Sequence, residues 1–87
     1  MINENQMNRL GYTLIGMKRV KEAIEFFKLN VEDYPQSSNT YDSLGEGYMI
    51  DGNKELAIKY YQLSIELNPK NANGIEKLKK LQETQKD

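Results

Sequence analysis

The chain has 87 residues and a formal net charge of −1, with 38% hydrophobic and 29% charged residues, which is typical of one small globular domain. The balanced charge gives no reason to expect nucleic acid or a membrane surface as a partner, and no apolar run approaches the roughly 18 residues of a membrane span. Because cysteine and histidine are both absent, disulfides, thiolate metal sites and histidine-based catalysis are excluded.

Two helices are predicted in the first part of the chain. The first spans 4–15, with Asn3 as its N-cap and Gln6 completing a capping box, since both side chains can satisfy free groups of the first turn. The second spans 20–34 and ends at Pro35, which has no N–H to donate. Apolar residues recur at helical spacing on one face of each helix. The two inward stripes consist of Met7, Leu10 and Leu14, and of Val20, Ala23, Ile24, Phe27 and Val31.

The next two helices are predicted at 38–50 and 54–67. Ser37 is expected to cap the earlier one with its side-chain oxygen. Between them, the Asp-Gly-Asn sequence at 51–53 breaks the chain with residues that tolerate a left-handed backbone, and Pro69 ends the later helix. Their inward stripes consist of Tyr41, Leu44 and Tyr48, and of Ala57, Ile58, Tyr61 and Ile65.

A fifth helix is predicted at 72–84, with Asn71 as its N-cap and a stripe of Ile75, Leu78 and Leu81. Its other faces carry lysines interleaved with acidic residues, and the segment has no aromatic side chain that could stack a base. We therefore interpret these faces as solvated and do not expect nucleic-acid binding. No strand pattern is present, so the predicted fold class is all-α.

Eight residue identities recur at a spacing of 34 positions, as in the repeating units of a solenoid. The pairs are Asn5/Asn39, Leu10/Leu44, Gly11/Gly45, Ala23/Ala57, Ile24/Ile58, Leu29/Leu63, Glu32/Glu66 and Pro35/Pro69. Gly11 and Gly45 lie in helix interiors next to leucines that we expect in the core, where glycine costs about 1 kcal/mol relative to alanine. This cost predicts close approach of a neighbouring helix, with Ala23 and Ala57 as the facing residues, and hence two antiparallel helical hairpins.

These residues resemble the tetratricopeptide repeat, a helix-turn-helix unit of 34 residues. The matching positions of the second repeat are Tyr41, Leu44, Gly45, Tyr48, Gly52, Ala57, Tyr61, Ser64 and Pro69. Those of the first are Met7, Leu10, Gly11, Leu14, Lys18, Ala23, Phe27, Asn30 and Pro35. The resemblance implies an α-α superhelix, or solenoid, of two repeats at 4–35 and 38–69 that is closed by a C-terminal capping helix at 72–84.

The first repeat departs from the family's pattern at two positions. Lys18 stands where the turn glycine is expected, and Asn30 replaces a small residue at a helix contact. We therefore expect a strained or altered first turn, with Gly16 as one alternative for the missing glycine.

The resemblance also implies a concave groove that binds a protein or peptide and is lined by the first helix of each repeat. The positions carried over are Asn5, Asn8, Arg9, Tyr12, Ile15, Gly16, Asn39, Asp42, Ser43, Glu46, Met49, Ile50, Asn73, Glu76, Lys77 and Lys80. Asn5, Asn39 and Asn73 can each bond a peptide backbone, or they can serve local capping and solubility instead. Some members of the family grip a terminal carboxylate with lysines and asparagines, but this chain lacks a clean set of them, so such a clamp is not favoured.

Nothing in the sequence resembles a nucleophile with its base, a phosphate loop or a metal cluster. We therefore assign no catalytic, cofactor or metal residues and do not expect an enzyme. The alternative to groove binding is a structural appendage that packs on a catalytic domain outside this sequence or on a second copy. Two repeats fall short of the three or more usually needed for stability, which favours a homodimer or larger assembly.

Four segments additionally resemble C-terminal tails of bacterial multidomain proteins, among them secreted or envelope serine hydrolases. They are 10–12, 27–31, 41–46 and 75–81. This likeness implies the cell envelope if the chain is the tail of an exported enzyme. A complete chain without a signal peptide would instead be cytoplasmic, and both compartments stay open.

Overall fold

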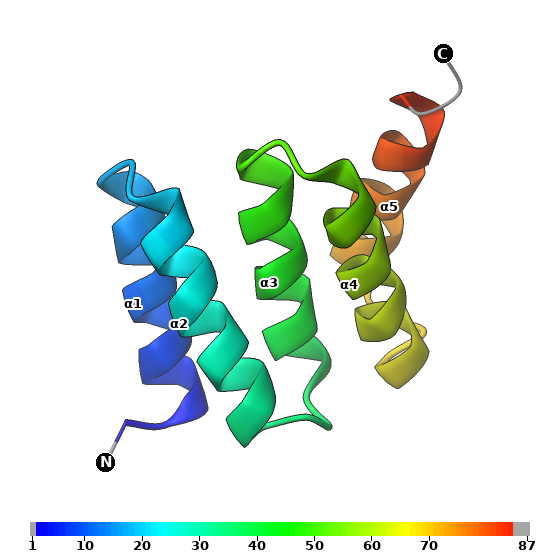
Figure 1. Ribbon diagram of the computed structural model, residues 1–87. Helices are drawn as coiled ribbons and strands as arrows, with labels where there is room; N and C mark the ends of the chain where they lie inside the picture. The colour runs from blue at the N-terminus through cyan, green and yellow to red at the C-terminus, as the bar shows by residue number, and fades with distance from the viewer. Residues whose placement is uncertain (1, 85–87) are drawn as a thin grey trace.

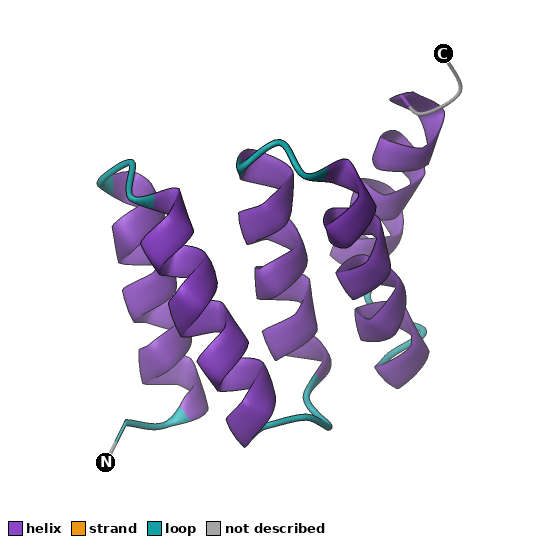
Figure 2. Ribbon diagram, viewed as in Figure 1, coloured by secondary structure: helices purple, strands orange, loops and turns teal. Residues whose placement is uncertain are grey.

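The computed structural model describes residues 2–84, which form five α-helices in a row (Figure 1). They are α1 (Glu4–Gly16), α2 (Val20–Asp33), α3 (Ser38–Ile50), α4 (Lys54–Leu67) and α5 (Ala72–Thr84). Successive helices run in opposite directions and pack on their sequence neighbours. The described part of the chain contains helices and loops without a strand (Figure 2), which confirms the all-α prediction, and each helix ends within one residue of its predicted position. No helix in this part is long and apolar enough to cross a membrane.

Two of the three predicted side-chain caps are present. The N–H of Gln6 donates to Oδ1 of Asn3 over 2.8 Å, and the N–H of Asn3 donates back to Oε1 of Gln6 over 3.0 Å, which completes the capping box of α1. At α5 the N–H of Gly74 donates to Oδ1 of Asn71 over 3.0 Å. These bonds satisfy amide groups that have no partner within the helix.

The predicted cap of α3 is wrong. The hydroxyl of Ser37 donates to Oε2 of Glu4 over 2.6 Å, so it ties the start of α3 to the start of α1 instead of bonding its own helix. The first turn of α3 is held by Thr40, whose N–H and hydroxyl both donate to the carbonyl of Ser37, over 3.2 Å and 2.9 Å. A carboxylate on a neighbouring helix therefore competes successfully for the serine hydroxyl.

The turn after α1 matches the turn after α3 despite the missing glycine. In both, the residue two positions past the helix is left-handed, with φ of 63° at Lys18 and 85° at Gly52. The N–H of Lys18 donates to the carbonyl of Ile15 and that of Arg19 to the carbonyl of Leu14, which is the Schellman pattern. Lys18 itself adopts the left-handed conformation, at a cost of about 1–2 kcal/mol. The expected strain is therefore present, whereas Gly16 belongs to α1 and does not replace the missing glycine.

The core is built around two aromatic rings that lie against glycines. Phe27 and Tyr61 are fully buried. A methyl group on Gly11 would lie 2.6 Å from Cζ of Phe27, and one on Gly45 would lie 3.1 Å from the ring of Tyr61. The predicted close approach is therefore present, and the three atoms nearest to each added methyl group belong to a ring one helical turn after the alanine. The buried apolar residues are Ala23, Ile24, Phe27, Leu44, Tyr48, Ala57, Tyr61 and Leu81.

Two residues of the predicted inward stripes are exposed instead. Leu10 is 41% exposed and Ile75 is 44% exposed, whereas Leu44 is 1% exposed. Leu44 lies in α3, which has helices on both sides, while α1 and α5 are the first and last helices of the described chain. The exposed fraction of a residue at a repeated position therefore depends on whether its helix lies at an end of the row or between two other helices.

Candidate functional site

Side chains from α1, α3 and α5 meet on one side of the molecule. These three helices run in the same direction and alternate with α2 and α4 (Figure 1). We call the surface that they share the A-helix face and define it by hydrogen-bonded residues that were predicted to line the groove. The members are Asn8, Tyr12, Asp42, Ser43, Glu46 and Asn73.

Two hydrogen bonds join α1 to α3 across this face. The hydroxyl of Tyr12 donates to Oε1 of Glu46 over 3.0 Å, and the hydroxyl of Ser43 donates to Oδ1 of Asn8. The ring of Tyr12 meets that of Phe27 edge to face, with centroids 5.2 Å apart. Tyr12 is thus anchored on the core while 36% of its surface remains exposed, which suits an aromatic contact residue.

Asp42 joins α3 to α5. Its Oδ2 accepts from Nδ2 of Asn71 over 3.0 Å, and its Oδ1 accepts from Nδ2 of Asn73 over 3.3 Å. Nδ2 of Asn71 also donates to the buried hydroxyl of Ser64 over 2.9 Å. Sequence reasoning identified Asn71 only as a cap. Asn71 follows Ser37 by 34 positions, and each reaches a carboxylate on another helix, a shared role that the sequence did not signal because Ser37 was itself predicted to be a cap.

The centre of the A-helix face is negative. Asp42 and Glu46 lie one helical turn apart, and the hydrogen bonds that they accept within residues 2–84 come from neutral donors, without an ion pair to either carboxylate. Burial, followed by the charges of Glu46 and Asp42, raises the pKa of Tyr12 to about 12, although a hydrogen bond with Ser43 opposes the shift. Burial and the same two carboxylates also raise the pKa of Tyr61. Loss of a proton from either phenol is therefore disfavoured at this face.

Tyr61 places a polar atom beneath this charged region. Its hydroxyl is buried and has no hydrogen-bond partner within the described residues. Since an unpaired buried hydroxyl costs about 1–3 kcal/mol, its retention requires a compensating gain. The ring supplies one, because it fills the space beside Gly45.

The three repeated asparagines do not cap their helices. Asn5 and Asn39 are exposed and form no side-chain hydrogen bond within residues 2–84, while Asn73 reaches across to Asp42. The capping alternative is therefore removed for all three, and solvation or ligand contact remains for Asn5 and Asn39.

The remaining predicted site residues fall into three environments. Ile15 and Met49 are half-buried against the core, Ile50 is exposed, and Lys77 is half-buried. Lys80 forms an ion pair with Glu76, with Nζ 3.2 Å from Oε1. Arg9 lines a pocket on α1 with Ile2, Gln6, Leu10 and Thr13 and is not bonded to the A-helix face. Within residues 2–84 no three acidic side chains come close enough together to hold a metal ion.

The helices alternate with a 34-residue period, and the packing of a ring on a glycine is repeated in both hairpins. These features define an α-solenoid built from helical hairpins. Two family models, both described as the tetratricopeptide repeat, match residues 38–71 and residues 7–31. The chain belongs to the tetratricopeptide repeat family.

Known proteins resemble this chain over most of its length. It is 28% identical over 64 residues to Cell division cycle protein 16 homolog of Homo sapiens, and equally to that of Mus musculus. Each match covers 74% of this chain and 10% of the relative, so the chain spans about a tenth of the length of these relatives.

A solved structure described as the first TPR of Spaghetti (RPAP3) bound to HSP90 peptide SRMEEVD is also similar. Its TM-score is 0.89 at 20% sequence identity, and the match covers 98% of this chain and 68% of that one. At this identity the likeness demonstrates the shared fold. The likeness to hydrolase tails stays a prediction.

Proposed function

We propose that this protein is a non-catalytic interaction module that binds an extended segment of a partner protein on the A-helix face. The single observation behind this proposal is that α1, α3 and α5 bring polar side chains together across one continuous face through hydrogen bonds. A face held in place by such bonds is ordered before a ligand arrives, which reduces the entropic cost of binding. The family and the fold are consistent with this role.

The charge of the face favours a ligand with a cationic side chain. Asp42 and Glu46 present two carboxylates without an ion pair inside the described chain, and both side chains are only partly buried. A lysine or arginine of the ligand placed between them would form charge-assisted hydrogen bonds, which contribute about 1.5–3 kcal/mol each. Exposed Ile50 and half-buried Met49 offer apolar contact near the end of α3.

The same charges argue against an acidic ligand. The peptide in the solved relative has the sequence SRMEEVD, which contains three acidic residues. Such a segment would be repelled by Asp42 and Glu46, and of the candidate lysines Lys80 is already paired with Glu76. We therefore propose that this chain binds a peptide, as that relative does, but not a peptide of the same acidic character.

A peptide library tests the proposal. Random peptides displayed with free C-termini are selected on the wild-type protein and then measured against the double variant Asp42→Asn/Glu46→Gln. Glu46→Gln keeps an acceptor oxygen for the hydroxyl of Tyr12. Asp42→Asn keeps one acceptor oxygen for Asn71 and loses the longer bond from Asn73, so circular dichroism verifies that the variant is folded. The matched control is Glu32→Gln/Glu66→Gln, which removes two exposed charges from α2 and α4.

We expect the selected peptides to share a lysine or arginine and to bind the first variant at least about tenfold more weakly, with the control unchanged. Failure to select any peptide, selection of acidic peptides, or equal binding to both variants would each contradict the proposal.

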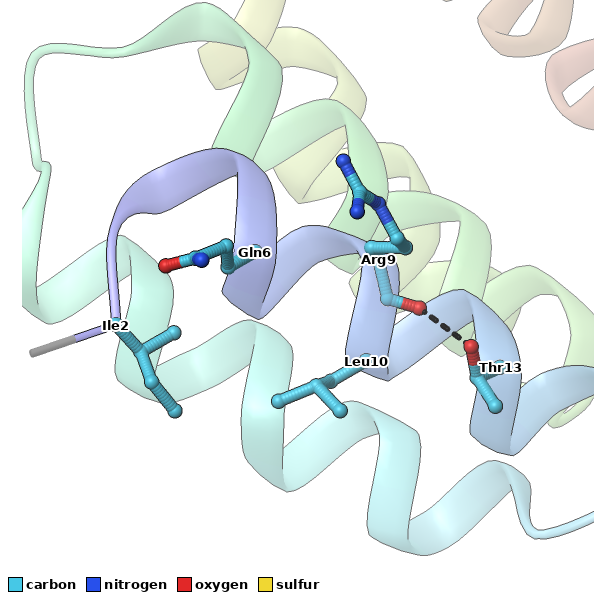
Figure 3. A pocket seen from close by; sticks show the side chains of 5 residues that line it. All are labelled: Ile2, Gln6, Arg9, Leu10 and Thr13. Atoms are coloured by element: carbon cyan, nitrogen blue, oxygen red, sulfur yellow. Dashed lines mark hydrogen bonds between the residues drawn. The ribbon is translucent and has the colours of Figure 1, made fainter.

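The exposed side of α1 supports a second candidate function, namely a structural appendage or homo-oligomer. Ile2, which is 49% exposed, and Leu10, which is 41% exposed, line one pocket (Figure 3). Exposed apolar side chains that lie together gain when another surface covers them. Sedimentation from micromolar to millimolar concentration tests this candidate, and a monomer throughout would remove the homo-oligomer.

A further inference from the structure

One buried hydroxyl is not needed for the packing of the core. Phe27 of the first repeat and Tyr61 of the second stand 34 positions apart, and both rings are fully buried against a glycine of the preceding helix. The two rings therefore fill equivalent spaces, but only Tyr61 carries a hydroxyl. Since Phe27 shows that this fold accepts a ring without one, packing explains the ring of Tyr61 and leaves its hydroxyl unexplained.

The repeat places this hydroxyl beneath the centre of the A-helix face. In the first repeat the ring of Phe27 contacts the ring of Tyr12, with centroids 5.2 Å apart. Glu46 follows Tyr12 by 34 positions, so it occupies the corresponding place beside the ring of Tyr61. Burial, followed by the charges of Glu46 and Asp42, raises the pKa of Tyr61, and the effect of these charges requires that both carboxylates lie near its hydroxyl.

These three groups lack a positively charged donor. Asp42 and Glu46 lie one helical turn apart on α3 and are only partly buried, and no ion pair within residues 2–84 involves either of them. The hydroxyl of Tyr61 is buried and has no hydrogen-bond partner within the same residues. Lys77 on the neighbouring helix α5 is half-buried and is not paired with either carboxylate. The positive charge must therefore come from a ligand.

The three groups fit a primary ammonium better than a guanidinium. An ammonium is compact and carries three donors, so it can bond two carboxylates and a hydroxyl oxygen at the same time. A guanidinium is planar and wider, and it pairs best with both oxygens of a single carboxylate. The carboxylate of Glu46 can turn to admit the ligand, because the hydrogen bond that it accepts from Tyr12 is exposed to solvent.

We propose that Asp42, Glu46 and Tyr61 form a subsite for the side-chain ammonium of a lysine in the bound segment, and that Tyr61 selects lysine over arginine. This inference rests on the proposed function for its cationic ligand and adds the residue that distinguishes the two cations. The free protein carries the cost of an unpaired hydroxyl, and the ligand supplies the partner. A chain-terminal amine is also a primary ammonium, but it lies next to peptide backbone and reaches a buried hydroxyl less well than a lysine on its four-carbon stem.

Short probes test the subsite without a selected peptide. They are a tripeptide with lysine between two alanines and both ends blocked, the same tripeptide with arginine, and trialanine amide, whose only cation is its terminal amine. Each is titrated into the isotopically labelled full chain at low salt, which limits screening, and dissociation constants are taken from nuclear magnetic resonance shifts. The variant is Tyr61→Phe. The matched control is Tyr60→Phe, which removes a half-buried tyrosine hydroxyl from the preceding residue of the same helix.

We expect wild type to bind the lysine tripeptide about tenfold more tightly than the arginine tripeptide or trialanine amide. Tyr61→Phe should lose this preference and bind the lysine tripeptide about tenfold more weakly, whereas Tyr60→Phe should bind it as wild type does. Urea unfolding should show that Tyr61→Phe is at least as stable as wild type, since the substitution removes an unpaired buried hydroxyl.

Several results would overturn the subsite. They are absence of binding, equal binding of the lysine and arginine tripeptides, or an unchanged dissociation constant in Tyr61→Phe. Tightest binding of trialanine amide would assign the subsite to a chain terminus instead of a lysine. A less stable Tyr61→Phe would show that the hydroxyl has a partner within the fold. Failure of the proposed function is recognised separately, by a library that yields no peptide whose binding depends on Asp42 and Glu46.

Discussion

Replacing Gly11 by alanine tests the packing that holds the repeats together. The new methyl group would lie 2.6 Å from Cζ and 2.7 Å from Cδ1 of Phe27, and closer still to Cε1. Carbon atoms in contact prefer separations of about 3.5–4.0 Å. Phe27 is fully buried, so its ring can move only if α2 moves with it.

The magnitude follows from two opposing terms. Overpacking of a core costs about 1–3 kcal/mol, and a rigid ring facing the methyl group places Gly11→Ala at the upper end. Alanine in place of glycine inside a helix returns about 1 kcal/mol. We therefore expect Gly11→Ala to lower the free energy of unfolding by about 2 kcal/mol, which for a domain of this size lowers Tm by roughly 8–16 °C.

Gly16→Ala is the matched control, because no atom lies within 4 Å of the added methyl group. It lies at the last residue of the same helix and should raise the free energy of unfolding by at most about 1 kcal/mol. Urea unfolding followed by circular dichroism measures both variants. If Gly11→Ala proved as stable as Gly16→Ala, the close contact between α1 and α2 would be incorrect.

Three further predictions concern a turn, a buried hydroxyl and the pH dependence. Lys18→Gly should raise the free energy of unfolding by about 0.5–1 kcal/mol, because it removes the strain of a lysine in the left-handed conformation. Gly52→Lys at the equivalent turn should lower the free energy of unfolding for the same reason. Thermal unfolding compares the two variants. Ser64→Ala should lower the free energy of unfolding by about 1–3 kcal/mol, because the carbonyl of Ser38 loses its donor and Nδ2 of Asn71 loses an acceptor. Urea unfolding measures the change, and a variant as stable as wild type would contradict the prediction. Because Tyr12 has a pKa of about 12 when folded and about 10 when unfolded, its contribution is constant below pH 10 and is lost between pH 10 and 12. Unfolding measured across that window should be less pH-dependent for Tyr12→Phe than for wild type.

The fold was predictable because its signals are local and repeated. Asn3 with Gln6, the proline at the end of each hairpin and the apolar spacing each depend on residues within one or two helical turns. The period of 34 residues then predicted that the two helical hairpins pack side by side. Even Lys18 follows from this reasoning, since Schellman hydrogen bonds impose the left-handed conformation whichever residue occupies the position.

The errors concern interactions between helices. Ser37 is a good cap by type, but Glu4 lies 33 positions earlier and takes its hydroxyl. Leu10 carries the same apolar signal as Leu44, yet its burial depends on whether a helix precedes it. Periodicity identifies the face of a helix and does not identify what covers that face.

Part of the candidate site was also predictable from the repeat. Tyr12 and Glu46 stand 34 positions apart, so they occupy equivalent positions on the first helices of the two repeats. In the structure they form a hydrogen bond. Asp42 and Asn73 were assigned to the same face, but their contact depends on the path of the turn before α5. Arg9 was assigned to the groove together with Asn8, but it lines a pocket with Leu10 instead. A one-residue step around a helix turns a side chain by about 100°, so adjacent residues such as Asn8 and Arg9 point in different directions.

Mapping a bound peptide onto the molecule tests the central claim most directly. A peptide selected from the displayed library would be titrated into isotopically labelled protein while backbone amide signals are followed by nuclear magnetic resonance. Binding at the A-helix face should shift the amides of Asn8, Tyr12, Glu46 and Asn73 and leave Leu29 on α2 unchanged. Shifts confined to α2 and α4 would place the ligand on the opposite helices and contradict the account.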